Sequence, residues 1–240
     1  MQIDIPSFSI SPYSFIVCLA VLTGFGVAVL LMRKFKVTLE TIFYTYLLTF
    51  ICTMVISISV TVTIKGGKIG AGFSGLGAGI GMVIGLFISS FIFNEKSEHI
   101  MASFVASAPL MYGLAKFGCL FAGCCHGKPY NGPFAITYHN RFEGTYFPTQ
   151  LINIIAFLMI HILALILVIK LKNKFKAICI IVAVTLPVRY SMEYLRDYHD
   201  GSIIASGQVK VLIASAVGIS FLIVWKLILN RLSRSAVKAD

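Results

Sequence analysis

Residues 147–169 read FPTQLINIIAFLMIHILALILVI and contain no Asp, Glu, Lys or Arg. Three other runs, residues 13–32, 41–64 and 69–93, are equally free of these four residue types. A helix needs roughly 20 apolar residues to cross the hydrocarbon core of a bilayer. Four such runs in a chain of 240 residues therefore predict a polytopic membrane protein.

Three further runs are apolar except for one or two charged residues each. They are residues 100–125, 177–195 and 209–229. With the four uncharged runs they predict an all-α integral membrane protein of about seven transmembrane helices. We expect these helices to form a single polytopic membrane domain over residues 1–240.

The charged residues are few and unevenly placed. They make up 12% of the chain, against about 25% in a soluble domain. The net charge of +11 would suggest nucleic acid binding in a soluble protein, but here it is better explained by topology. Basic residues follow the first, third, fifth and seventh runs, and the positive-inside rule makes that side cytoplasmic. The N-terminus is then outside and the C-terminus inside, and no nucleic acid partner is expected.

Residues 123–149 form the longest polar stretch, and it is rich in aromatic side chains. It carries His126, Lys128, His139 and Arg141, and aromatic rings favour the membrane interface. The stretch predicts an ordered loop on the outer face, either a small hairpin or a helix lying at the interface. An ordinary interfacial loop is the alternative.

Arg189, Glu193 and Arg196 follow an apolar run at spacings of four and three residues, so on a helix they share one face. Charges within a membrane are costly and therefore face a cavity, a partner or a ligand. The planar guanidinium can hold two oxygens of one phosphate, which suggests a site for a phospholipid headgroup. Alternatively, Glu193 is only a bridge between the two arginines.

Lys116 lies within an otherwise apolar run, either as a second cation at the headgroup or with its ammonium reaching the surface. Tyr13, at the outer end of the first run, is either an interfacial aromatic or a hydroxyl that faces the cavity.

Cys124-Cys125-His126 resembles a metal motif, but zinc sites usually need four ligands and no second Cys/His pair follows. We expect no metal. A nucleophilic Cys125–His126 pair and simple packing by small cysteines are the remaining interpretations.

The stretch KFGCLFAGCCHGKP, residues 116–129, resembles the signature of prolipoprotein diacylglyceryl transferases, roughly G-R-I-G-C-F-x-x-G-C-C-Y-G-[RK]-P in Gram-positive members. Further motifs agree in order and extend the resemblance over nearly the whole chain. They are Tyr13, Phe73-Ser74-Gly75-Leu76 for H-G-G-L, Phe147-Pro148-Thr149-Gln150-Leu151 for H-P-[ST]-Q-L, Arg189 to Arg196 for R-x-x-x-E-F-x-R, and Gly207-Gln208.

The resemblance implies an enzyme of lipoprotein biosynthesis at the outer side of the bacterial plasma membrane. Such enzymes transfer diacylglyceryl from phosphatidylglycerol to the thiol of a lipobox cysteine in a secreted preprotein. Glycerol phosphate leaves, and no metal or soluble cofactor is used. By the same resemblance, Arg189 binds the headgroup, Glu193 orients Arg189, and Gly127 permits close backbone approach. The residues expected to bind substrate are Tyr13, Gly75, Lys116, Cys119, Gly127, Lys128, Arg141, Gln150 and Arg196.

The chain departs from the family pattern at its histidines. Phe73 and Phe147 stand where the pattern has histidine, and Asn153 stands where an acid usually follows. We therefore expect His126 or His139 to act as the base beside Arg189 and Glu193. The departures keep two alternatives open, which are a paralogue with a different acceptor and a non-catalytic lipid-binding membrane protein. A small transporter is disfavoured because the polar residues cluster at one end of the spans.

Overall fold

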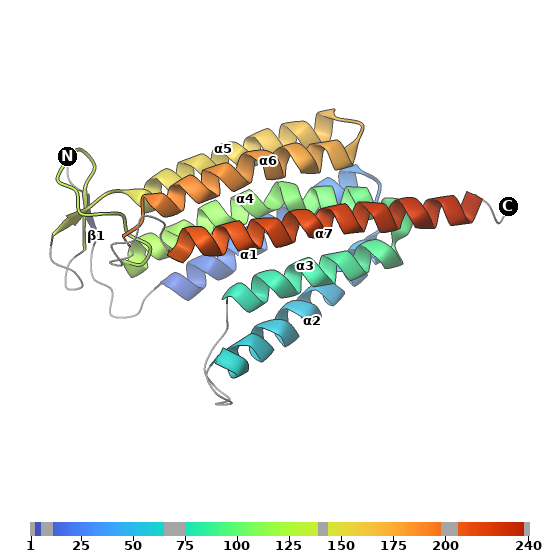
Figure 1. The fold of residues 1–240 in the computed structure, drawn as a ribbon, viewed down its shortest axis with the longest axis horizontal. Helices are drawn as coiled ribbons and strands as arrows, with labels where there is room; N and C mark the ends of the chain where they lie inside the picture. The colour runs from blue at the N-terminus through green and yellow to red at the C-terminus, as the bar shows by residue number, and fades with distance from the viewer. Residues whose placement is uncertain (1–2, 6–11, 65–74, 139–143, 198–205, 238–240) are drawn as a thin grey trace. The chain divides into compact units, whose positions relative to one another are not determined.

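The computed structural model describes residues 3–5, 12–64, 75–138, 144–197 and 206–237. Each of the seven apolar runs contains a helix (Figure 1). The helices are α1 (Tyr13–Lys34), α2 (Leu39–Ile64), α3 (Gly75–Ile92), α4 (Ser97–Ala122), α5 (Thr149–Lys170), α6 (Lys174–Tyr194) and α7 (Ser206–Val237). A short 3-10 helix, η1 (Asn94–Lys96), precedes α4. The predicted helical class is confirmed.

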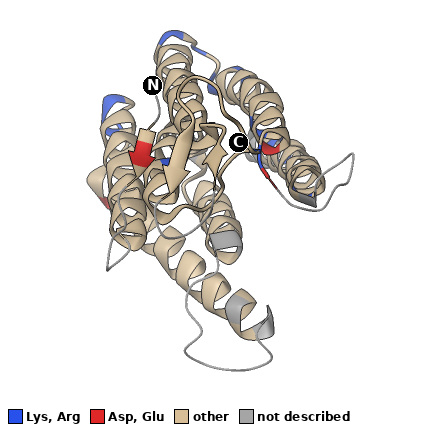
Figure 2. Cartoon of the chain, turned by 90° about the vertical axis from the view of Figure 1, so that its left-hand side faces the viewer, with Lys and Arg blue, Asp and Glu red and all other residues tan. Residues whose placement is uncertain are grey.

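Six of the described helices are long and apolar enough to cross a membrane, and α3 offers only the shorter apolar stretch Gly77–Ile92. Large apolar side chains such as Phe15 and Leu30 are 73% and 70% exposed, which suits lipid and not water. Figure 2 shows the helical ribbons almost entirely in uncharged residues. A multi-pass membrane protein is therefore supported, while the count of seven spans and the N-out orientation stay predictions.

The chain groups into two compact units, and the expectation of one membrane domain stays a prediction. The unit of Val29–Ser103 and Leu222–Asp240 contains the α2–α3 pair. A Cβ added at Gly77, Gly81 or Gly85 of α3 would lie 2.8, 2.5 or 2.6 Å from the nearest backbone atom of α2. Small residues permit such close helix packing in membranes. The later glycines of the glycine-rich run thus serve packing, while residues 70–74 lie outside the described residues.

The other unit contains Met1–Ala28 and Phe104–Phe221 and carries a three-stranded sheet in the order β1-β2-β3. Strand β1 (Ile3–Ile5) is parallel to β2 (Ile136–Tyr138), and β2 is antiparallel to β3 (Thr145–Tyr146). The buried side chains of the sheet pack on Leu120 at the end of α4. Figure 1 shows the strands beside this end of the helix. The predicted hairpin is thus present as β2 and β3, whereas β1 was not foreseen.

Candidate functional site at the ends of α4 and α6

The turn after α4 is built by left-handed backbone. The N–H of Gly123 (φ +66°) donates to the Leu120 carbonyl at 3.3 Å, and the N–H of Cys124 donates to the Cys119 carbonyl at 3.1 Å. This pair of bonds is a Schellman motif, which brings the side chains at its two ends together. Cys125 follows at φ +59°, a conformation that is uncommon without glycine and is found often at functional sites.

Residues 126–130 are held between two other parts of the chain. The N–H of Lys128 donates to the Leu195 carbonyl, and the N–H of Asp197 donates to the His126 carbonyl, both at 3.3 Å. On the other side, the N–H of Phe147 donates to the Lys128 carbonyl at 2.9 Å. The signature strip, residues 116–129, therefore joins the end of α6 to the β3 side of the hairpin.

Gly127 lies at the closest point of this junction. A Cβ there would be 2.5 Å from the Phe147 carbonyl oxygen and 2.8 Å from the Phe147 Cβ. Backbone atoms cannot move aside as a flexible side chain can, so only glycine fits. The close approach expected at Gly127 exists, and it is made to the chain itself.

Side chains in the first turn of α5 also hold the turn that follows α4. Gln150 is fully buried and donates from Nε2 to the Cys124 carbonyl at 3.0 Å and to the Tyr138 hydroxyl at 2.6 Å. Thr149 donates from Oγ1 to the Leu195 carbonyl at 3.3 Å. These contacts give Gln150 a structural task, and its expected contact with substrate stays a prediction.

The arginine–glutamate trio is assembled at the end of α6. Glu193 is 1% exposed, pairs with Arg189, and accepts from Arg196 Nη1 at 2.9 Å. The expectation that all three share one helix face is wrong for Arg196, because α6 ends at Tyr194 and Arg196 reaches back from beyond it. The trio carries two positive charges and one negative charge, so a net positive charge remains for an anion.

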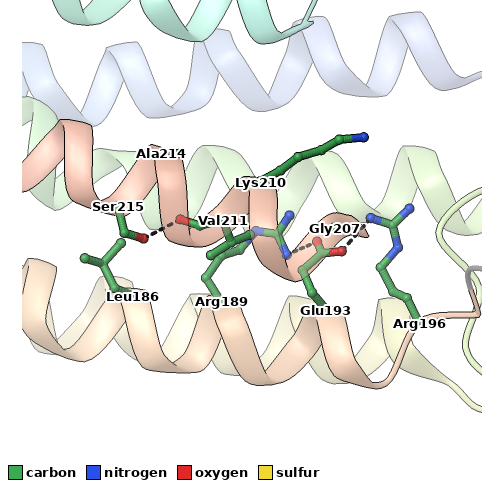
Figure 3. Close-up of a pocket in the computed structure, with 9 residues that line it drawn as sticks. All are labelled: Leu186, Arg189, Glu193, Arg196, Gly207, Lys210, Val211, Ala214 and Ser215. Atoms are coloured by element: carbon green, nitrogen blue, oxygen red, sulfur yellow. Dashed lines mark hydrogen bonds and ion pairs between the residues drawn. The ribbon is translucent and has the colours of Figure 1, made fainter. Parts of the chain in front are cut away.

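A cavity of about 470 Å³ lies beside the trio, between α6 and α7 (Figure 3). Its lining combines the charged trio with small and apolar side chains. The lining residues are Leu186, Arg189, Glu193, Arg196, Gly207, Lys210, Val211, Ala214 and Ser215. The sequence analysis did not single out Lys210, although it follows Gln208 of the Gly207-Gln208 motif by two residues.

Tyr112 connects the trio with Lys116. The Lys116 Nζ lies 4.9 Å from the centre of the Tyr112 ring, and the Arg189 Cζ lies 5.0 Å from it. Both distances are within the range of cation–π attraction. Lys116 is only 6% exposed, so the interpretation that its ammonium reaches the surface is wrong. Sequence reasoning missed Tyr112, although it precedes Lys116 by one helical turn.

Three thiols gather at the end of α4. The Sγ atoms of Cys119, Cys124 and Cys125 all lie within 4.8 Å of one another. Hydrogen bonds from Cys119 and Cys124 hold the pKa of the Cys125 thiol below its usual range, and the charges of Lys116 and Arg196 act in the same direction. Lys116 and Arg196 are thus the two cations that act on this thiol.

The other residues expected at the site differ in burial and in their contacts. His126 is buried, with Nδ1 3.1 Å from the Gly127 carbonyl and its ring 4.6 Å from that of Tyr146. It is not among the residues that line the described cavity. Lys128 is exposed and lies 4.1 Å above the ring of Tyr194.

Tyr13 approaches the thiols from α1. A Cβ at Gly118 would lie 3.2 Å from the Tyr13 carbonyl oxygen, which shows how close α1 and α4 are there. Tyr13 also lies close enough to the three thiols and to Lys116 for electrostatic interaction. Gly75 begins α3 in the other unit, while His139 and Arg141 lie outside the described residues.

Neither Phe147 nor Asn153, which stand where the family pattern has a histidine and an acid, supplies a base. Phe147 packs against Tyr130, with ring centres 5.2 Å apart. Asn153 donates from Nδ2 to the Thr149 carbonyl at 2.7 Å, and its buried Oδ1 has no hydrogen-bond partner among the described residues. Phe73 lies outside the described residues.

Residues 1–225 match the family model described as prolipoprotein diacylglyceryl transferase. The chain belongs to this family. No individually curated protein matches it. Membership in the prolipoprotein diacylglyceryl transferase family implies a membrane transferase, and the resemblance found in the signature strip is confirmed. The matched residues include all segments that meet at the ends of α4 and α6.

Proposed function

We propose that the protein transfers diacylglyceryl from phosphatidylglycerol, or a similar anionic phospholipid, to the thiol of a lipobox cysteine in a secreted preprotein. Glycerol phosphate leaves. The observation that carries the proposal is the cavity beside Arg189, Glu193 and Arg196, where two arginines share one buried carboxylate. Their surplus positive charge suits a phosphodiester, and the apolar lining suits the lipid attached to it.

Four charged side chains have a role in this reaction. Arg189 and Arg196 hold the phosphate oxygens, and Glu193 fixes the two guanidinium groups. Lys116 lies close to the ring of Tyr112, as Arg189 does. Its ammonium adds positive charge where the phosphate accumulates negative charge. Fixed donors directed at developing charge are a large source of rate enhancement.

The reaction also needs a base that removes the proton from the acceptor thiol. A thiolate, not a thiol, attacks the glyceryl carbon. His126 and His139 were proposed as bases, but His126 is buried against Tyr146 and His139 lies outside the described residues.

We place the reaction at the outer side of a bacterial plasma membrane, with the N-terminus outside, because basic residues follow alternate spans.

The proposal is tested with purified protein in vesicles that contain phosphatidylglycerol and a lipobox peptide. We expect the peptide to gain the mass of diacylglyceryl while glycerol phosphate is released in equal amount. A peptide with serine in place of the lipobox cysteine is the control and should remain unmodified. Absence of any lipid turnover would contradict the proposal and support a lipid-binding protein.

A second candidate keeps the donor and changes the acceptor. It is favoured by Phe147 and Asn153, which stand where the family pattern has a histidine and an acid. In the same experiment, release of glycerol phosphate without a change in peptide mass would support this candidate.

A further inference from the structure

Tyr112 lies outside the motifs that the chain shares with the family, and its hydroxyl has no task in the reaction as described so far. It belongs to α4 and precedes Lys116 by one helical turn. Its ring packs on Phe157 of α5, with ring centres 4.3 Å apart, and Phe157 is only 2% exposed. Side chains packed in such a buried place occupy defined rotamers, so the hydroxyl has a fixed position.

The Tyr112 hydroxyl is buried, and among the described residues it has no hydrogen-bond partner. A buried polar group in this state lowers the stability of the folded protein, so it needs an explanation. Lys116 lies near enough to interact with the hydroxyl oxygen, but an ammonium group can only donate a hydrogen bond. The hydroxyl proton is therefore left without an acceptor in the described part of the chain.

The charged groups around Tyr112 cannot supply that acceptor, because all three are cations. Lys116 Nζ and Arg189 Cζ lie 4.9 and 5.0 Å from the centre of its ring. Arg196 interacts with Tyr112 electrostatically. Ammonium and guanidinium groups carry donors and no acceptor. The missing partner is therefore an anion with oxygen acceptors, which is the chemistry of a phosphate group.

We propose that Tyr112 is a further phosphate-binding residue of this site, and that its hydroxyl donates a hydrogen bond to a phosphate oxygen of the headgroup. The proposal rests on the proposed transfer from a phospholipid. Arg189 lines the cavity and also contacts the Tyr112 ring. A phosphate that Arg189 and Lys116 bind together must lie beside that ring, because both cations contact it. The hydroxyl then adds a neutral donor to the two charged ones.

The charges of this group suit the leaving phosphate better than the intact phospholipid. Lys116, Arg189 and Arg196 carry three positive charges and Glu193 carries one negative charge, which leaves two positive charges. A phosphodiester carries one negative charge, whereas a phosphate monoester carries about 1.5 to 2 at pH 7. Interactions that strengthen as the reaction proceeds increase turnover more than they increase substrate affinity. We therefore expect the Tyr112 hydroxyl to act mainly on kcat.

The bonds and charges of the transfer step balance. The acceptor thiolate attacks the glyceryl carbon, and a C–S bond forms. The C–O bond to phosphate breaks, its electron pair stays on the phosphate oxygen, and glycerol phosphate leaves with a second negative charge. Tyr112 keeps its proton throughout, and its hydrogen bond stabilises the phosphate as this charge develops.

The first measurement is thermal unfolding of the full-length protein in detergent, without ligand and with increasing concentrations of glycerol phosphate. Tyr112→Phe removes only the hydroxyl oxygen and keeps the ring. Without ligand, we expect its melting temperature to equal or exceed that of the wild type, because the hydroxyl lacks a partner in the free protein. Its affinity for glycerol phosphate should fall by about 10–100-fold, the contribution of a hydrogen bond to a charged group.

The second measurement is the release of glycerol phosphate from phosphatidylglycerol vesicles. Tyr112→Phe should lower kcat by about 10–100-fold and leave KM nearly unchanged. Tyr190→Phe is the matched control, since Tyr190 is a half-buried tyrosine of α6 that does not line the cavity. It should retain the affinity for glycerol phosphate and the turnover of the wild type.

Two results would overturn the inference. The first is a Tyr112→Phe variant that melts well below the wild type without ligand and binds glycerol phosphate with unchanged affinity, because the hydroxyl would then be structural. The second is an unchanged kcat in Tyr112→Phe, which would leave the proposed function standing. Conversely, a wild type that turns over no phosphatidylglycerol, but binds glycerol phosphate more tightly than Tyr112→Phe does, would remove the proposed function and leave Tyr112 as a phosphate ligand.

Discussion

Replacing Arg189 separates a role in phosphate binding from a role in neutralising Glu193. Arg189→Ala removes one of the two counter-ions of a carboxylate that is 1% exposed, while Arg196 still pairs with it at 2.9 Å. Removing one partner of a fully buried pair costs about 3–5 kcal/mol. Because Arg189 is 25% exposed and Glu193 keeps Arg196, we expect a loss of unfolding free energy nearer to about 2 kcal/mol.

The expected loss of activity is larger than this loss of stability. Removing one fixed donor to a developing negative charge lowers kcat by about 10²–10³-fold. Arg189→Lys should fall between wild type and Arg189→Ala, because it keeps the charge and loses the two-oxygen geometry. The assay is release of glycerol phosphate from phosphatidylglycerol vesicles, with thermal unfolding measured on the same preparations.

The double variant Arg189→Ala/Glu193→Gln is the decisive control. It removes the buried negative charge that Arg189 neutralised, and the amide oxygen of the introduced glutamine can still accept from Arg196, so part of the lost stability should return while activity stays low. Recovery of activity in the double variant would show that Arg189 serves only to neutralise Glu193. Unchanged activity in Arg189→Ala would refute the headgroup site directly.

Three further predictions concern the scaffold. Gly127→Ala should lower the unfolding free energy by about 1–3 kcal/mol and reduce activity, because its Cβ would lie 2.5 Å from the Phe147 carbonyl oxygen; thermal unfolding and the vesicle assay measure both. Gly81→Ala should weaken the packing of α3 on α2, whereas Gly79→Ala, which meets no atom within 4 Å, should be neutral or slightly stabilising; equal melting temperatures would contradict this. Gln150→Leu should cost about 2 kcal/mol through two lost hydrogen bonds, and an unchanged melting temperature would show that these bonds contribute nothing.

The helices could be predicted because each depends only on its own residues. An uncharged run of about 20 apolar residues is a property of one segment, and five of the helices begin and end within three residues of the expected positions. The helix α7 continues to Val237, eight residues beyond the expected end, and α3 is described only from Gly75. The strand β1 could not be found in this way, since Ile3–Ile5 is three residues long and is defined only by its pairing with β2.

The site was predicted by residue type and only partly by position. Lys116, Glu193 and the arginines stood out because charge in an apolar run needs an explanation. The place of Arg196 was missed, because a spacing of three and four residues assumes that the helix continues. The thiol cluster was missed for a related reason, since only the turn after α4 brings Cys119 next to Cys124.

The seam between α2 and α3 has a further consequence. Its glycines recur every four residues, so sliding α3 by four residues, about 6 Å, would bring glycine opposite α2 again at most of the same places. The evenly spaced glycines therefore let α2 and α3 pack closely, but they do not fix the position of α3 along the axis of α2. An aperiodic contact elsewhere in this unit marks the axial position of α3, since the Trp225 indole of α7 donates to Ser90 Oγ of α3 at 2.8 Å. A slide of α3 by one repeat would carry Ser90 away from that fully buried indole N–H, so this hydrogen bond fixes the axial position of α3 against α7.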